Sequence, residues 1–118
     1  MDTKKLIQAI VEASDDKGAK EPVVLDMRKV SLISDYFFIC HATNERQTKA
    51  IATGIKAILE EKGLTIDTME GFEQGRWIVI DTGGYVLCHI FHEDERRHYH
   101  LERLWGDASR VPLPLGQE

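Results

Sequence analysis

The sequence predicts an α/β (α+β) fold, a mixed β-sheet of about five strands with helices packed on it. The chain has 118 residues, which suits a single hydrophobic core. Short apolar runs rich in β-branched residues alternate with stretches whose apolar residues recur at helical spacing. Two of the apolar runs are separated by Gly83 and Gly84, a pattern typical of a β-hairpin. In chain order the elements read αββαβββα, which favours one sheet covered by helices.

The first part of the chain predicts a helix followed by two strands. The helix is expected from about residue 3 to the break at 15–18, and its helically spaced apolar residues are Leu6, Ile7, Ile10 and Val11. Residues 22–27 and 36–42 are apolar runs that predict strands, the second of them largely buried. The connection at 28–35 carries no pattern that defines its structure.

The second helix has the clearest pattern in the sequence. Asn44 is a suitable N-cap, Gln47 follows three residues later, and Gly63 is a suitable stop. The apolar stripe between these ends consists of Ala50, Ile51, Ile55, Ile58 and Leu59. One amphipathic helix is therefore expected between Asn44 and Gly63.

The remaining elements complete a single domain over residues 1–108. They are an edge strand at 64–70, a polar loop at 71–75, hairpin strands at 76–82 and 85–91, and a helix at 93–105. The tail at 109–118 contains two prolines and is predicted to be irregular.

The hairpin predicts a candidate binding face. If Gly83 and Gly84 form a two-residue turn, paired residues sum to 167 in number. One face then carries Ile78, Ile80, Leu87, His89 and Phe91, and the other carries Trp77, Val79, Asp81, Val86, Cys88 and Ile90. Both faces are apolar, so a face without helices would make Trp77 a partner anchor. The alternative is that a helix covers Trp77.

Composition limits the classes of partner and the cellular compartment. The formal net charge of −5 argues against broad nucleic-acid contact and favours a basic protein partner. Cys40 and Cys88 lie in apolar runs and are expected as buried, reduced thiols rather than a disulfide. The amino terminus lacks a signal-peptide core and no stretch reaches bilayer length, so a cytoplasmic protein without membrane contact is expected.

The histidine-rich segment 89–100 does not predict a metal site. His98 and His100 point roughly 200° apart on a helix, and the segment lacks HExxH spacing. His89, alone on an apolar face, is more typical of a core histidine than of a catalyst. Arg96, Arg97 and Tyr99 are candidates for a polar recognition edge, or simply for a solvated helix face.

Enzyme motifs are also missing from the sequence. The loop before the second helix contains no glycine, and no D-x-D lies on an expected strand, so metal-dependent nucleotidyl transfer lacks its residues. No G-x-S-x-G supports a hydrolase. We therefore expect no catalytic residues, no metal and no cofactor, with a nucleotide-binding or nucleotidyltransferase-type enzyme as the alternative.

Three stretches of the sequence, taken in order, resemble the bacterial ribosomal silencing factors and the related plant protein Iojap. They are "SDYFFICHATNERQTKAIA", "MEGFEQGRWIVIDTGGYVLCHIF" and "RRHYHLERLWGDA", and with "VVLDMRKVS" they span residues 23–108. Two departures are the glycine-free "HATNER" loop and Gly84, where an acidic residue is common in the family.

The resemblance implies a nucleotidyltransferase-like fold without catalytic residues, acting as a binding module. It implies docking on the fourteenth protein of the large ribosomal subunit, which blocks subunit joining and represses translation under nutrient limitation. It also implies a link to large-subunit biogenesis and a possible homodimer. With Val79 from the same hairpin strand, the partner-binding residues that we expect are Glu70, Trp77, Val79, Asp81, His89, Arg97 and Tyr99.

Overall fold

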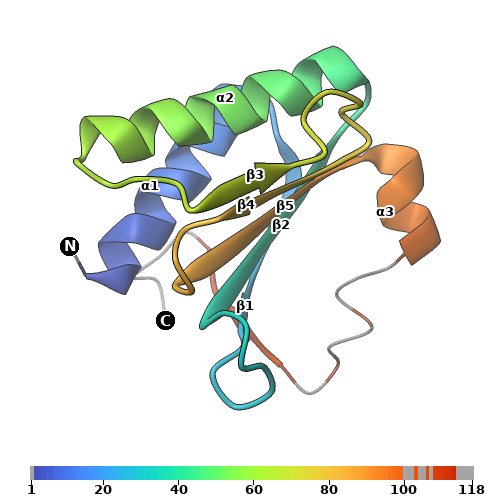
Figure 1. Ribbon diagram of the computed structural model, residues 1–118. Helices are drawn as coiled ribbons and strands as arrows, with labels where there is room; N and C mark the ends of the chain where they lie inside the picture. Colours follow the sequence, from blue (N-terminus) through green and yellow to red (C-terminus); the bar gives the residue numbers. More distant parts are fainter. Residues whose placement is uncertain (1, 100–102, 104–105, 107, 114–118) are drawn as a thin grey trace.

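A computed structural model describes residues 2–99, 103, 106 and 108–113, which form a six-stranded mixed sheet with helices on both faces (Figure 1). The helices are α1 (Thr3–Asp16), α2 (Glu45–Glu61) and α3 (Glu93–Tyr99). The strands are β1 (Lys20–Asp26), β2 (Tyr36–Ala42), β3 (Thr68–Glu70), β4 (Trp77–Asp81), β5 (Val86–His92) and β6 (Ser109–Val111). The predicted fold class is confirmed.

The sheet has the order β3-β4-β5-β2-β1-β6, with β2 and β5 paired in parallel at its centre. β6 was not expected, because residues 109–118 predict an irregular tail. That prediction is wrong at Ser109–Val111, which pair antiparallel with the free edge of β1. A three-residue strand followed by Pro112 has too little local pattern to predict, and pairing with an existing edge creates it. Residues 114–118 of the tail lie outside the described residues.

The first two helices begin as their sequences predict. Asp2 accepts a hydrogen bond from the backbone N–H of Lys5 at 2.8 Å, and Asn44 accepts one from Gln47 at 2.8 Å. These contacts satisfy N–H groups that a helix start leaves free. The third helix is confirmed over Glu93–Tyr99, and most of the remaining stretch predicted to be helical lies outside the described residues.

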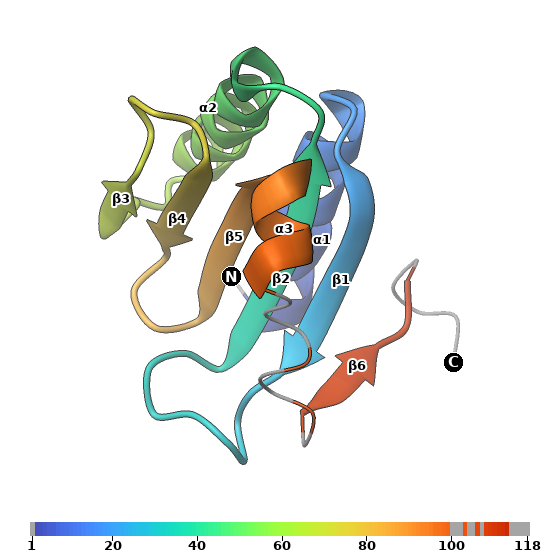
Figure 2. The same cartoon turned by 90° about the vertical axis from the view of Figure 1, so that its right-hand side faces the viewer.

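The two sheet faces carry different cores. α1 and α2 lie together on one face and enclose the larger cluster, which includes Ile10, Ile51, Ile55, Ile78 and Ile90. On the opposite face, α3 lies across β5 and β2 (Figure 2) above a smaller cluster of Leu25, Met27, Phe37, Ile39 and Phe91. Among the described residues, the sheet is therefore covered more thinly on the α3 side.

The predicted hairpin register is wrong by one residue. Trp77 pairs with Phe91 and Val79 with His89, so partners sum to 168 rather than 167. The connection is longer than two glycines, because the backbone N–H of Thr82 bonds the carbonyl of Val86 across it. A shift of one residue moves every side chain of a strand to the other face.

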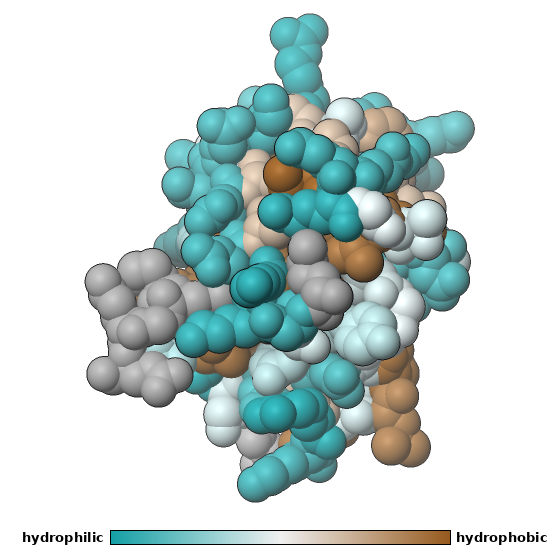
Figure 3. Space-filling model, turned by 90° about the vertical axis from the view of Figure 1, so that its left-hand side faces the viewer, coloured by the Kyte–Doolittle hydropathy of each residue, from teal (hydrophilic) through white to brown (hydrophobic). Residues whose placement is uncertain are grey.

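The corrected register changes the composition of both faces. Trp77, Val79 and Asp81 share a face with Leu87, His89 and Phe91, whereas Val86, Cys88 and Ile90 face α1 and α2 with Ile78 and Ile80. The side of the molecule opposite to the view of Figure 2 is mostly hydrophilic, with scattered apolar residues (Figure 3). Among the described helices, none is long and apolar enough to cross a membrane.

Candidate partner-binding surface

Five of the seven residues expected to bind a partner lie on the sheet face beneath and beside α3. Trp77, Val79 and Asp81 come from β4, and His89 lies opposite Val79 on β5. Glu70 pairs with Val79 from the other side, on β3. Directly paired residues of antiparallel strands point to the same face, so the sheet brings these side chains together.

α3 brings a sixth residue to this face. The ring of Tyr99 lies 5.0 Å from the ring of Trp77, and Tyr99 remains 43% exposed. Arg97, the seventh, is also exposed, but its guanidinium pairs with Glu93 one turn earlier in the same helix, at 3.5 Å. We call Glu70, Trp77, Val79, Asp81, Leu87 and Tyr99, none of which is buried, the Trp77 surface.

Trp77 is the centre of an aromatic cluster. Its ring centroid lies 4.9 Å from that of Phe91, and Tyr99 packs on it from α3. The side chain is half-buried, so the helix covers Trp77 only in part. An aromatic ring held by neighbouring rings and still reachable by solvent has the form of an interface anchor.

His89 lies beneath the Trp77 surface rather than on it. Its side chain is 5% exposed, and its Nδ1 accepts a hydrogen bond from the indole N–H of Trp77 at 3.2 Å. Burial lowers the pKa of His89 to about 4, so the imidazole is neutral at pH 7. Its Nε2 is buried without a hydrogen-bond partner among the described residues. Direct contact with a partner would require a rearrangement of its neighbours.

Acidic side chains lie at the edge of the Trp77 surface. Glu70 is exposed on the edge strand β3, and Asp67 and Glu73 are exposed on either side of it. Asp81 is half-buried, and its Oδ1 accepts hydrogen bonds from the backbone N–H groups of Gly83 and Gly84 at 3.0 and 3.1 Å. Asp81 therefore shapes the turn in addition to adding negative charge.

Arg96 fixes α3 on the sheet, which the sequence pattern does not predict. It is 7% exposed rather than part of an exposed edge, and its guanidinium donates to the carbonyl of Glu21 at 2.7 Å. The same Nη1 lies 2.9 Å from Nδ1 of His41, and burial followed by the charge of Arg96 lowers the pKa of His41. The carbonyls that Arg96 binds lie at an irregularity in β1, where Glu21 has a φ of 46°. Such irregularities are not visible in the sequence.

Arg76 forms a second link to α3. No sequence pattern predicts a role for this residue. Its Nη2 lies 2.8 Å from Glu95 of α3, and its Nη1 lies 3.0 Å from Glu45 at the start of α2. Hydrogen bonding to Arg76 lowers the pKa of the Glu45 carboxyl. Because Arg76 directly precedes Trp77, these ion pairs connect the start of β4 to both α2 and α3.

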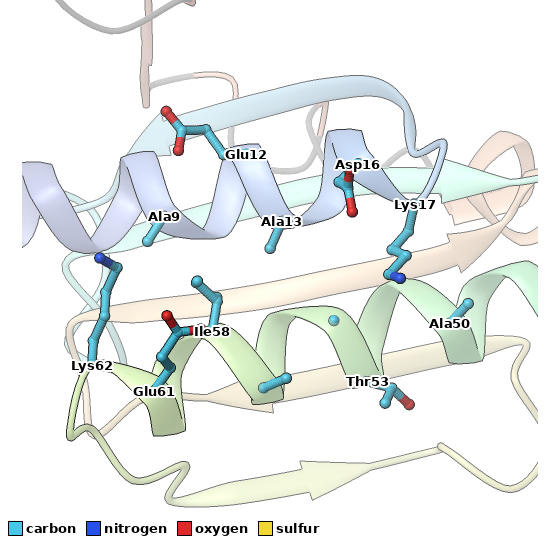
Figure 4. A pocket seen from close by; sticks show the side chains of 12 residues that line it. Ala9, Glu12, Ala13, Asp16, Lys17, Ala50, Thr53, Ile58, Glu61 and Lys62 are labelled. Atoms are coloured by element: carbon cyan, nitrogen blue, oxygen red, sulfur yellow. The ribbon is translucent and has the colours of Figure 1, made fainter.

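A groove lies elsewhere, between α1 and α2 (Figure 4). It has a volume of about 720 Å³, small side chains such as Ala9, Ala13 and Ala50 line it, and Glu12 and Lys62 stand at its sides. Its charged lining is mixed, with the acids Glu12, Asp16 and Glu61 and the lysines Lys17 and Lys62. In the part of the chain that the structure describes, no three His, Cys, Asp or Glu side chains gather as metal ligands would.

The two cysteines are free and buried, as predicted. Burial raises the pKa of the Cys40 thiol to about 12 and also raises that of Cys88. Both thiols therefore stay protonated at pH 7 and are poor nucleophiles. They act as small apolar residues between the sheet and α2.

A family model described as "Ribosomal silencing factor during starvation" matches residues 1–118. The chain belongs to the ribosomal silencing factor family. It is 49% identical over 113 residues to ribosomal silencing factor RsfS of Halalkalibacterium halodurans, covering 96% of each chain. It is 44% identical over 116 residues to ribosomal silencing factor RsfS of Bacillus subtilis, covering 98% of each chain.

More distant relatives and solved structures agree with this assignment. The chloroplastic protein Iojap of Zea mays is 26% identical over 107 residues, which cover 91% of this chain and 46% of Iojap. A crystal structure from Bacillus halodurans is 46% identical, with a TM-score of 0.82 over 92% of this chain and 98% of that one. A crystal structure from Chromobacterium violaceum has a TM-score of 0.86 at 30% identity, over 90% of this chain and 88% of that one.

Family membership defines the general role of the chain. A ribosomal silencing factor regulates translation in association with the ribosome, and this role is regulatory rather than catalytic. The Trp77 surface exposes the aromatic side chain of Tyr99 and the acidic side chain of Glu70.

Proposed function

We propose that this silencing factor docks through the Trp77 surface on the fourteenth protein of the large ribosomal subunit and thereby blocks subunit joining when nutrients are limiting. The observation that carries the proposal is the half-buried Trp77, held between Phe91 and Tyr99 on the thinly covered sheet face. Tryptophan is enriched among the residues that dominate binding energy at protein interfaces.

Charge supports a basic protein as the partner. The chain carries a formal net charge of −5, and Asp67, Glu70 and Glu73 are exposed beside the aromatic cluster. An acidic rim around an apolar centre accelerates association with a basic surface and sets its orientation. The same charge disfavours direct contact with ribosomal RNA.

Silencing by this route requires no catalysis. A folded body of 33 × 32 × 27 Å on the face where the subunits meet excludes the small subunit by its volume. We therefore propose a cytoplasmic binding protein without enzymatic activity, which also accompanies large-subunit assembly. Calorimetry with nucleoside triphosphates and Mg²⁺ tests this, because measurable binding would favour a nucleotide-dependent enzyme instead.

Replacing Trp77 by alanine tests the docking surface. We expect Trp77→Ala to weaken binding to the purified fourteenth large-subunit protein by about thirtyfold or more, because the anchor is lost. Tyr85→Ala is a matched control, since Tyr85 is 55% exposed and lies beside Leu6 and Leu64 on the α1 and α2 side. Undiminished binding by a folded Trp77→Ala protein would rule out this surface.

Sedimentation with separated ribosomal subunits tests the functional consequence. The protein should migrate with the large subunit alone in a sucrose gradient and reduce the amount of joined ribosomes. The Trp77→Ala protein should do neither at the same concentration. Migration with the small subunit, or normal joining in the presence of bound protein, would contradict the proposal.

A second copy of the chain is the competing occupant of the same surface. If a homodimer forms through the Trp77 surface, Trp77→Ala should shift sedimentation equilibrium towards the monomer, and the ribosomal protein should dissociate the dimer. A dimer that persists in the Trp77→Ala protein would place self-association on another surface.

A further inference from the structure

We infer that His89 is a positioning residue that fixes the indole of Trp77 and satisfies its N–H from within, so that the docking partner receives only the carbon edge of the ring in an apolar pocket. This inference rests on the proposed function and adds a chemical description of the partner. It separates the two residues that the sequence suggests as contacts: Trp77 makes the contact, and His89 sets its orientation.

The hydrogen bond defines the state of His89. The indole N–H can only donate, so Nδ1 of His89, at 3.2 Å, must be unprotonated and accept. The neutral imidazole then carries its proton on Nε2. Phe37 lies 4.8 Å away and Phe91 6.2 Å away between ring centroids, and these rings prevent the imidazole from turning freely.

Histidine at position 89 lowers the stability of the fold, and its advantage over an apolar residue is that it can orient Trp77. Nε2 is buried with no hydrogen-bond partner among the described residues, and a buried unpaired donor is destabilising. A phenylalanine would fill the same volume among Phe37 and Phe91 without this cost. What phenylalanine lacks is the acceptor atom that faces the indole of Trp77. The unpaired Nε2 of His89 therefore lowers the stability of the fold, while the hydrogen bond at Nδ1 fixes the orientation of the Trp77 indole.

The orientation of the ring determines what a partner meets. The N–H edge of Trp77 points towards His89, which is buried. The accessible remainder of the indole is hydrocarbon. A pocket that receives it needs apolar walls and no acceptor, and a ring already held in place loses less conformational entropy on binding.

The indole resonance of Trp77 reports the orientation without any partner. The chain has two tryptophans, and Trp77→Phe identifies which of the two indole N–H signals belongs to residue 77. The side chains of asparagine and leucine have nearly the same shape, but only asparagine can place an oxygen where Nδ1 of His89 lies. His89→Asn and His89→Leu are therefore a matched pair. We expect the signal to stay near its native position in His89→Asn and to move towards that of a free indole in His89→Leu.

Affinity for the fourteenth large-subunit protein completes the test. His89→Leu should bind about tenfold more weakly than His89→Asn, the effect of one lost hydrogen bond. In a Trp77→Phe background this difference should vanish, because no indole N–H remains to be held. If the smaller side chains prevent folding, His89→Phe replaces them, because it keeps the volume of the ring. Its affinity is then compared with that of the wild type.

The outcomes separate this inference from the proposed function. Equal binding by the His89 variants, or a difference that persists in the Trp77→Phe background, would overturn the positioning role even if Trp77→Ala abolishes docking. If Trp77→Ala binds normally, the docking proposal fails. The indole signal then still decides whether His89 holds the ring, since it is measured on the free protein.

Discussion

The two faces of the sheet differ in how completely helices cover them. Against α1 and α2, the central residues Ile78, Ile80, Cys88 and Ile90 are fully buried. Against α3, the adjacent residues of the same strands include the half-buried Val79 and Leu87. The face covered by α1 and α2 therefore buries most of the apolar core, whereas the α3 face keeps some apolar groups partly exposed.

The largest expected effect belongs to the well-covered face. Ile55 of α2 is fully buried there, and Ile55→Ala should lower the free energy of unfolding by about 4 kcal/mol, the sum of lost burial and a new cavity. Urea denaturation measures this change. A loss below about 1 kcal/mol would show that the face tolerates cavities and is not the main source of stability.

On the α3 face, we expect acid to lower the free energy of unfolding through His89, by less than the Ile55→Ala substitution does. In the unfolded chain, the imidazole of His89 becomes protonated below about pH 6.5. In the folded chain, the same imidazole stays neutral until the pH approaches its pKa of about 4. Stability should therefore fall as pH drops from 6.5 to 4, by on the order of 3 kcal/mol from this group.

Comparison with His89→Phe isolates this contribution from that of the carboxylates. The variant lacks the titrating ring, so its unfolding free energy should fall less between pH 7 and pH 4.5 than that of the wild type. Parallel pH profiles for the two proteins would mean that His89 takes up a proton in the folded state as readily as in the unfolded one.

The smallest of the three effects tests how α3 is attached. Arg96→Ala removes the hydrogen bonds to Glu21 and His41, which should cost about 2 kcal/mol and accelerate hydrogen exchange in α3 more than in α2. Arg97→Ala is the matched control, because Arg97 is exposed and, within the described residues, its ion pair joins it to Glu93 of the same helix. Equal effects of the two substitutions would show that α3 does not depend on Arg96.

The sequence predicts well where structure follows from local pattern. The apolar stripe between Asn44 and Gly63 gives α2 with its cap, and the buried run at 36–42 gives β2. The sequence pattern fails to predict the structure where a single hydrogen bond determines the register of a hairpin. The bond from Thr82 to Val86 lengthens the hairpin connection and shifts its register by one residue.

The candidate site is predictable in part for the same reason. Trp77, Glu70 and Tyr99 can be chosen by residue type and family resemblance, but their common face depends on the hairpin register. The burial of Arg96 and His89 depends on distant carbonyls and rings, which no pattern within a helix or strand encodes. Sequence thus indicates which residues are chemically suited to bind, and three-dimensional contacts decide which of them are accessible.

The parallel pairing of β2 with β5 has a consequence for synthesis of the protein. Each pair in this ladder, such as Tyr36 with Val86, joins residues 50 positions apart. β5 lies between β2 and β4, so the sheet cannot assemble on a nascent chain until the residues up to His92 have left the exit tunnel. Such distant contacts form late in folding. We therefore expect a silencing factor that becomes competent only after the residues up to His92 have emerged from the ribosome that makes it.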